Sequence, residues 1–237
     1  MDEMAAVRKL VLLPGMDGTG TLFGAFIEAL PKGFEALPVS YPNDRPLTYT
    51  EMADFVRMRL PASEPFVLLA ESFSTPLAIQ IATANLAGLR ALVLVAGFAT
   101  NPTYRWVRRL SSFIFPPRKR IRAPGFFIER YLLGRGASPA MVQAVQQAVH
   151  SVGPEVLDSR ARLVLACDVR AELARMKVPI LYVQATQDRV VPPRCLDEIL
   201  AVRREISVAR IEGPHLLLQR EPQQSAEIIT QFIQQLQ

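Results

Sequence analysis

Three side chains in this sequence, Ser72, Asp188 and His215, are of the types that together perform nucleophilic acyl transfer. Each follows a segment whose apolar run predicts a strand. A serine hydroxyl needs a neighbouring base to become a nucleophile, and the base needs an acceptor that fixes its tautomer. Because the carboxyl ends of parallel strands meet at one edge of a sheet, we expect the three side chains to lie together. The sequence therefore predicts Ser72 as nucleophile, His215 as general base and then acid, and Asp188 as the group that orients His215.

The segment around Ser72 has the pattern of a sharp strand-to-helix turn. The apolar run ends at Ser72, and helical spacing begins at once, with Pro76 in the first turn, where a missing N–H costs nothing. The small residues Ala70 and Ser74 flank the serine. Such a turn lifts its central side chain clear of the sheet. The alternative interpretation is that Ser72 only caps a helix.

Rival assignments exist for the base and for the acid. The sequence holds two histidines. His150 is predicted at the end of a helix with no paired acid in view, whereas His215 could also be a histidine in a surface turn. Asp188 could be a turn or N-cap aspartate. Asp168 and Asp197 are rival acids, but the pattern places both inside helices and not after a strand.

Acyl transfer also needs N–H donors for the developing oxyanion. In this geometry one donor is the N–H of the residue after the nucleophile, Phe73, and the second is the N–H of Met16, in the loop after the first strand. Glycines at 15, 18 and 20 allow close backbone approach in that loop. A phosphate-binding loop is the alternative, but the stretch lacks both Gly-x-Gly-x-x-Gly and the Lys-Ser/Thr ending of a P-loop.

The elements that must position these residues alternate between strands and helices. Strands are predicted at 7–13, 34–39, 66–71, 91–95, 178–184 and 206–211. Helices are predicted between them, one opened by a capping box at Thr48-Tyr49-Thr50-Glu51 and the last at 225–236. Near-continuous apolar strands alternating with helices predict an α/β fold with a doubly wound, mostly parallel sheet of about six strands.

The alternation stops between residues 101 and 175. Helices are predicted there near 104–114, 126–133, 138–149 and 154–169. An all-helical insertion between two strands of a parallel sheet is most simply a cap over the carboxyl edge. The sequence therefore predicts an α/β core from 1–100 and 176–237 and a helical cap, or lid, from 101–175.

The net charge of +5 comes from one part of the cap. Between Arg105 and Arg135 lie nine basic residues and one acid, Glu129, which leaves 18 basic and 21 acidic residues elsewhere. Three interpretations are open: a helical cap whose arginines face water, a docking surface for an anionic acyl carrier (coenzyme A, acyl carrier protein or an acidic lipid surface), and a nucleic-acid site. The last is the least favoured, because no recognition motif accompanies the charge.

Composition and cysteine usage narrow the class further. The apolar run at 10–13 is too short for a signal peptide, and no stretch approaches the length of a membrane span. Cys167 and Cys195 lack metal-type spacing and give no disulfide framework. We therefore expect a cytoplasmic protein that is not transmembrane, with two free thiols and with no metal or cofactor.

Over nearly its whole length the chain resembles the serine α/β-hydrolases. The resemblance is carried by a small set of residues: Ser72, Asp188 and His215 in that chain order, the loop Leu13-Pro14-Gly15-Met16-Asp17-Gly18-Thr19-Gly20, and Glu71-Ser72-Phe73. The last two stretches are similar to bacterial esterase/lipase-like members and to the acyltransferase-type relatives known as phytyl ester synthases.

The chain departs from this family pattern at a few positions. Ala70 and Ser74 replace the usual glycines around the nucleophile, and Pro14 stands where many members have a histidine before the glycine. Both replacements beside the nucleophile are small, so the turn should survive. A serine at this turn, and not an aspartate, argues against dehalogenases and epoxide hydrolases.

Together these observations predict a serine hydrolase that cleaves a small-molecule carboxylic ester through an acyl-enzyme. The alternatives are a thioesterase or acyltransferase that uses the same triad on CoA- or carrier-linked acyl groups and, from another class, a non-catalytic ligand-binding protein on a hydrolase scaffold.

Overall fold

The computed structural model describes residues 7–62, 64–103 and 124–236. Within them the centre is a six-stranded sheet in the order β2-β1-β3-β4-β5-β6, and every neighbouring pair is parallel. The strands are β1 (Lys9–Leu13), β2 (Glu35–Pro38), β3 (Phe66–Glu71), β4 (Leu89–Val95), β5 (Ile180–Ala185) and β6 (Ser207–Ile211). The predicted α/β class and six-stranded parallel sheet are confirmed, with strand ends differing by one or two residues.

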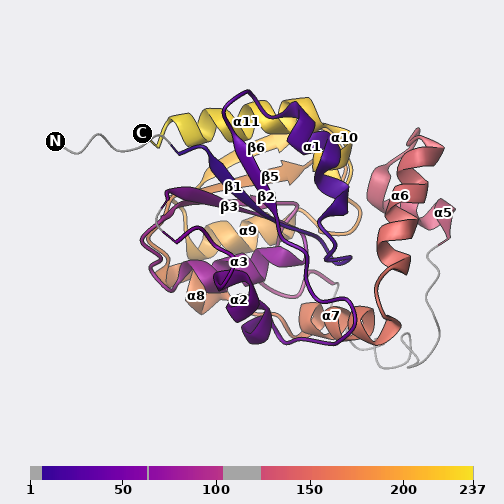
Figure 1. Ribbon diagram of the computed structural model, residues 1–237, viewed down its shortest axis with the longest axis horizontal. Helices are drawn as coiled ribbons and strands as arrows, with labels where there is room; N and C mark the ends of the chain where they lie inside the picture. Colours follow the sequence, from indigo (N-terminus) through magenta and orange to yellow (C-terminus); the bar gives the residue numbers. More distant parts are fainter. Residues whose placement is uncertain (1–6, 63, 104–123, 237) are drawn as a thin grey trace.

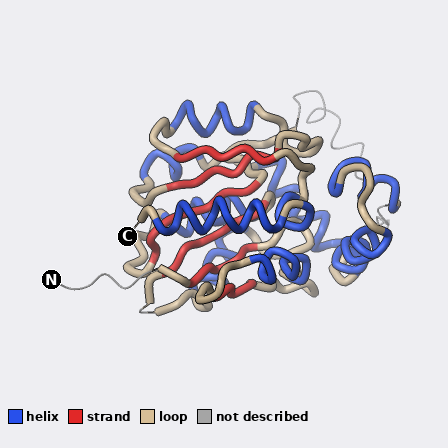
Figure 2. Tube along the Cα trace, turned by 90° about the horizontal axis from the view of Figure 1, so that it is seen from above, coloured by secondary structure: helices blue, strands red, loops and turns tan. Residues whose placement is uncertain are grey.

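Helices cover both faces of this sheet (Figure 1). One face carries α1 (Gly24–Ala29), α10 (Leu217–Arg220) and α11 (Pro222–Gln234), with the short turn η1 (Thr21–Phe23) before α1. The opposite face carries α2 (Tyr49–Arg57), α3 (Ser74–Ala82), α8 (Arg170–Arg175) and α9 (Arg194–Val202). In Figure 2 the helix that leads to the C-terminus lies across the strands.

The alternation of side chains along β1 explains the near-continuous apolar runs. Leu10 and Leu12 point into the core beneath α1 and α11, whereas Val11 and Leu13 point into the core beneath α2 and α3. All four are fully buried. Because helices cover both faces, each successive residue of a central strand must be apolar.

The capping box predicted at the start of α2 is present. The Glu51 N–H donates to the Thr48 hydroxyl, and the Glu51 carboxylate accepts from the Thr48 N–H at 2.7 Å. These bonds satisfy two N–H groups that a helix start leaves without an intrahelical partner.

The described chain between β4 and β5 is helical. It holds α5 (Gly125–Phe127), a π-helical turn η2 (Ile128–Leu133), α6 (Pro139–His150), α7 (Pro154–Ala166) and α8. In both views α5 and α6 lie beyond one end of the sheet, the end toward which the β5 arrow points in Figure 1. The helix predicted near 104–114 lies outside the described residues.

The π-helical turn and α6 pack onto the loop that follows β6. Ile128, Leu133 and Val145 form a small buried cluster with Leu216. The Leu216 N–H also donates to the Leu132 carbonyl at 2.9 Å. This helical segment therefore contacts the chain one residue beyond His215.

The predicted end of one helix in this segment is wrong. The pattern at 154–169 predicts a single helix containing Asp168, but α7 ends at Ala166, and Asp168 lies in an isolated antiparallel bridge with Thr100 before α8 begins. Cys167 takes an extended conformation at the helix end, and its carbonyl accepts from the Asn101 N–H. A tertiary pairing with the loop after β4 thus overrides the local helical pattern.

Two smaller points complete the fold. Within the described ranges no helix is long and apolar enough to cross a membrane. Cys167 and Cys195 are buried and free, as the cysteine spacing predicts.

Candidate active site

The turn between β3 and α3 holds its central serine in a strained conformation. Ser72 has a φ of +50°, in the left-handed region that residues other than glycine rarely adopt. The Ser72 N–H donates to the Val95 carbonyl at 2.9 Å, and the Ser72 carbonyl accepts from the Thr75 N–H at 2.9 Å. Hydrogen bonds on both sides of the residue stabilise a conformation that costs about 1–3 kcal/mol. The sharp turn expected around Ser72 is therefore present.

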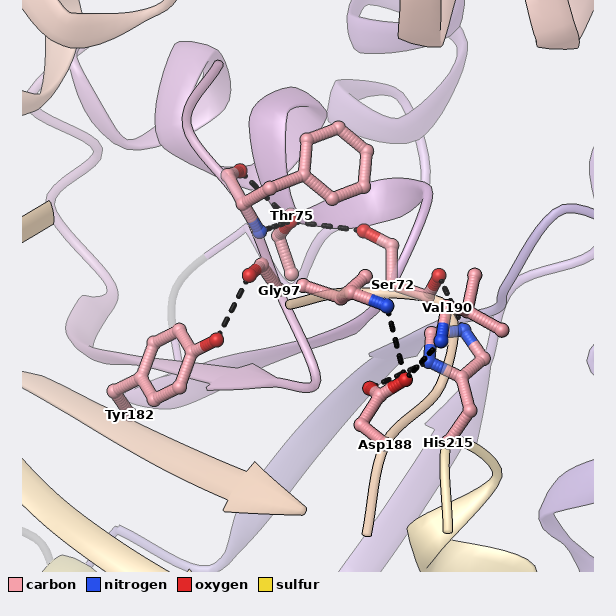
Figure 3. Close-up of polar contacts among 9 residues, drawn as sticks. Ser72, Thr75, Gly97, Tyr182, Asp188, Val190 and His215 are labelled. Carbon is pink, nitrogen blue, oxygen red and sulfur yellow. Dashed lines mark hydrogen bonds and ion pairs between the residues drawn. The ribbon is translucent and has the colours of Figure 1, made fainter. Parts of the chain in front are cut away.

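Thr75 ties this turn to the loop after β4 (Figure 3). Its hydroxyl accepts from the Phe98 N–H at 3.0 Å and lies 2.8 Å from the Ser72 carbonyl and 3.1 Å from the Phe98 carbonyl. A Cβ at Gly97 would lie only 2.6 Å from Thr75 Cγ2, so the two loops approach as closely as a glycine allows. The Tyr182 hydroxyl, from β5, donates to the Gly97 carbonyl at 2.8 Å.

The structure brings the predicted serine, histidine and aspartate together at the carboxyl edge of the sheet (Figure 3). His215 Nε2 lies 2.9 Å from Ser72 Oγ, and His215 Nδ1 lies 2.8 Å from Asp188 Oδ2. An ionised carboxylate only accepts, so Nδ1 carries the proton and Nε2 is free to accept from the serine hydroxyl. The three residues follow β3, β5 and β6. Ser72 and His215 are separated by 143 positions in the chain.

Two backbone groups fix the orientation of the aspartate. Asp188 Oδ1 accepts from the Val190 N–H at 2.7 Å and from the Val191 N–H at 2.9 Å. These bonds occupy one carboxylate oxygen and aim the other, Oδ2, at His215. Both side chains of the Asp188–His215 pair are about 95% buried.

The environment of His215 moves its pKa in two opposing directions. Burial alone lowers the pKa, but the adjacent Asp188 carboxylate, through its charge and its hydrogen bond, and the nearby Glu71 together raise it above the usual value. A histidine with a raised pKa is a stronger base, and general-base catalysis needs it neutral at the working pH.

The two predicted oxyanion donors lie in segments that follow the neighbouring strands β1 and β3. Met16 is in the loop after β1, and Phe73 directly follows Ser72 at the start of α3. The turn and loop hydrogen bonds of the described residues include none donated by either N–H group. The two N–H groups therefore meet one requirement of the predicted oxyanion donors.

Several hydrogen bonds hold the loop after β1 in place. The Ser74 hydroxyl donates to the Pro14 carbonyl through a short hydrogen bond and accepts from the Tyr41 hydroxyl at 2.6 Å. The Gly18 N–H donates to the Gly15 carbonyl at 3.0 Å. Since C=O and N–H point in opposite directions across a trans peptide, fixing the Gly15 carbonyl also fixes the direction of the Met16 N–H. Ser74, which replaces the usual glycine, thus helps to hold the loop after β1 through its hydroxyl.

One titratable residue at the site, Glu71, is missed by sequence reasoning. It ends β3, directly before Ser72, and is 2% exposed. Burial raises its pKa to about 7; His215 and a hydrogen bond from Gln219 act in the opposite direction, and Asp17 adds to the rise. The signal in the sequence was a carboxylate at the end of an otherwise apolar strand.

The rival residues lie elsewhere. Asp168 is exposed and pairs with Arg170 at 2.6 Å, Asp197 is in the first turn of α9, and His150 is at the end of α6. No interaction joins any of them to Ser72 or His215 within the described chain.

Much of the basic segment lies outside the described residues. Of its nine basic residues, seven fall in 104–123, and Arg130 and Arg135 are described. The docking-surface interpretation therefore stays a prediction. Among the residues that the structure covers, no group of three His, Cys, Asp or Glu side chains is placed to hold a metal ion.

Comparison with known proteins bears on the architecture. No protein-family model matches the chain, and no curated protein matches it. Solved structures do match the chain. The enol-lactonase from Burkholderia xenovorans LB400 is 14% identical with a TM-score of 0.80, over 96% of this chain and 91% of that one. The chain has the α/β-hydrolase fold.

Two other solved structures match this chain over a similar share of its length. A hydrolase from Pseudomonas aeruginosa PA01 is 19% identical with a TM-score of 0.80, over 97% of this chain and 91% of that one. The esterase RhEst1 from Rhodococcus sp. ECU1013 is 19% identical with a TM-score of 0.78, over 98% and 92%. The α/β-hydrolase resemblance of the sequence is therefore confirmed as a fold, and the reaction must be argued from the site.

Proposed function

We propose that this protein is a serine hydrolase that cleaves a carboxylic ester through an acyl-enzyme. The observation that carries the proposal is the continuous hydrogen-bonded chain from Ser72 Oγ through His215 to Asp188, with the serine on a strained turn at the carboxyl edge of the sheet. A serine hydroxyl is a weak nucleophile by itself and becomes effective when a base accepts its proton.

In the first half-reaction Ser72 Oγ attacks the ester carbonyl carbon while His215 Nε2 accepts the hydroxyl proton. The Asp188 carboxylate stabilises the resulting imidazolium and holds the ring in place. The tetrahedral intermediate then collapses, and His215 returns the proton to the departing alkoxide, which leaves as an alcohol. Ser72 remains acylated.

In the second half-reaction a water replaces the alcohol. His215 accepts a proton from the water as its oxygen attacks the acyl carbonyl, and the proton passes to Ser72 Oγ when the acid leaves. In both halves the carbonyl oxygen becomes negative, and the N–H groups of Met16 and Phe73 are the proposed donors to it. Their support is that both stay unbonded beside the nucleophile in the described chain.

We also propose the division into a core, 1–100 and 176–237, and a helical cap, 101–175. The hydrogen bond between Leu132 and Leu216 supports this division, because it joins the helical segment to the residue that follows His215. A small acyl ester is the proposed substrate, the cytoplasm the proposed location, and an anionic acyl carrier or lipid surface the proposed partner of the basic segment.

Labelling with a fluorophosphonate tests the nucleophile. The reagent should form a covalent adduct on Ser72, seen as a mass shift of one label per chain. Ser72→Ala should abolish the label and lower kcat by about 10⁴- to 10⁶-fold. Ser207→Ala, an exposed serine on β6, is the matched control and should behave as wild type. Absence of label in the wild type, or a label that persists in Ser72→Ala, would overturn the assignment.

A substrate panel separates the reaction types. Aryl and alkyl esters of increasing acyl length are compared with the corresponding acyl-CoA thioesters, with and without an added alcohol acceptor. Faster turnover of the esters, with free acid as the product, supports the hydrolase. Preference for thioesters or transfer to the alcohol would reassign the protein to one of the two alternatives that share the triad.

A further inference from the structure

Arg160 is a buried arginine that the triad does not use. It lies in α7, which Figure 1 shows below the sheet on the side of α2, and it is 3% exposed. No carboxylate pairs with it among the described residues. Its guanidinium instead donates to three backbone carbonyls: Met16 at 2.9 Å, Asp17 at 2.8 Å and Pro42 at 3.0 Å.

A buried guanidinium without a directly bonded carboxylate is costly, so its hydrogen bonds must be well made. The carbonyl oxygens supply partial negative charge, and the nearby Asp17 carboxylate acts on Arg160 through its charge without a direct ion pair. Arg160 Cζ also lies 5.7 Å from the Tyr41 ring centroid and 6.0 Å from the Phe73 ring centroid. The cation therefore lies between the two loops that carry the proposed oxyanion donors.

These contacts complete the anchoring of the loop after β1. The Pro14 carbonyl is held by Ser74, the Gly15 carbonyl by the Gly18 N–H, and the Met16 carbonyl by Arg160. The peptide units on both sides of Met16 are thus fixed. With both fixed, the Met16 N–H has one direction, and preorganised donors of this kind need no rearrangement as charge develops.

The guanidinium of Arg160 approaches Gly18 closely. Gly18 has a φ of +68°, and a Cβ there would lie 2.5 Å from Arg160 Nη1. The guanidinium is therefore packed directly against the turn that sets the Met16 N–H.

We propose that Arg160 is a positioning residue for the oxyanion hole, through which helix α7 holds the Met16 N–H in its donor direction. The inference rests on the proposed function. Arg160 acts through the Met16 and Asp17 carbonyls and does not touch the substrate. The positive charge adds to the effect, because it favours the negative oxygen of the tetrahedral intermediate over the neutral ester.

The test compares Arg160→Met with Arg160→Lys and with a matched control, Arg162→Met. Arg162 is an exposed arginine on the same helix, paired with Asp158. Met keeps the stem but loses all donors, and Lys keeps the charge but cannot reach three carbonyls at once. Because a misplacement of about 1 Å costs about 10²-fold, Arg160→Met should lower kcat by about 10²-fold with KM changed less than about threefold. Arg160→Lys should fall between it and the wild type, and Arg162→Met should match the wild type.

A pair of ligands separates positioning from a purely structural role. A trifluoromethyl ketone of the preferred acyl chain adds to Ser72 Oγ and forms a tetrahedral alkoxide, with the serine proton passing to His215. The matching secondary alcohol cannot form this adduct. In Arg160→Met the affinity for the ketone should fall by the same factor as kcat, while the affinity for the alcohol stays within about threefold. Equal loss of both affinities, or a kcat within threefold of wild type, refutes the inference.

Two further readouts keep the result decisive. If Arg160→Met does not fold, Arg160→Lys decides: wild-type kcat and ketone affinity refute the inference, and a matched loss of both supports it. A structure of the wild-type ketone adduct must place the alkoxide within about 3 Å of the Met16 N–H with Arg160 still on the Met16 carbonyl; any other placement refutes it. Failure of the wild type to react at Ser72 would instead remove the proposed function.

Discussion

Replacing Glu71 by glutamine should alter the pH dependence of both stability and activity. The carboxyl is buried beside His215 and Asp17, and its pKa is about 7 against 4.5 for an exposed glutamate. Glutamine has nearly the same shape and carries no charge. The variant therefore removes the titration while keeping the packing.

The sign follows from proton binding. Between pH 4.5 and about 7 the folded state holds a proton on Glu71 that the unfolded state has released, so this group makes folding less favourable as pH rises through that window. The full cost is present above about pH 7. At about 1.4 kcal/mol per pH unit, the rise from 4.5 to about 7 corresponds to at most about 3–4 kcal/mol. Glu71→Gln should match the wild type near pH 4.5 and exceed its free energy of unfolding by up to about 3–4 kcal/mol at pH 8.

Urea unfolding at pH 4.5, 6 and 8 measures this difference, with constant m-values showing that the transitions stay comparable. Ser207→Ala, which removes an exposed polar group, is the control and should match the wild type at all three pH values. Glu71→Gln has a second readout, the pH profile of kcat/KM. Glu71 raises the pKa of His215, so its removal should move the acidic limb of the pH profile to lower pH. A stability difference that is constant with pH, or an unmoved acidic limb, would refute the reasoning.

Three further changes test the neighbouring contacts. Asp188→Asn should lower kcat by about 10⁴-fold, because the histidine loses the acceptor that fixes its tautomer, whereas Asp168→Asn should stay near wild type; the reverse result would show that the acid is misassigned. Gly18→Ala places a Cβ against Arg160 at positive φ and should lower both Tm and kcat, whereas Gly136→Ala, at φ +75° in open space, should lower Tm slightly and leave kcat unchanged. Thr75→Val removes the acceptor of the Phe98 N–H and should destabilise the fold by about 1–3 kcal/mol in urea unfolding; an unchanged midpoint would contradict this.

The periodic features of the fold were predictable from the sequence because their causes are local. A strand covered on both faces requires apolar residues in succession, as in β3, and the capping box at Thr48 and Glu51 depends on residues three positions apart. The convergence of the three side chains was predictable for a related reason. In a parallel sheet the carboxyl ends of all strands meet at one edge, so Ser72, Asp188 and His215 converge once each is placed after a strand.

The tertiary structure alone decided the features that depend on distant packing. The pKa of Glu71 follows from exclusion of water by elements far along the chain, and its hydrogen-bond partner, Gln219, is 148 positions away. Arg160 reaches the Met16 carbonyl across 144 positions, and Asp168 leaves its helical pattern to pair with Thr100. Burial and long-range hydrogen bonds leave no periodic pattern in the sequence. An arginine in a helix or a carboxylate at the end of a strand has the same local sequence whether it is buried or exposed. Their energies exist only once the segments are packed together.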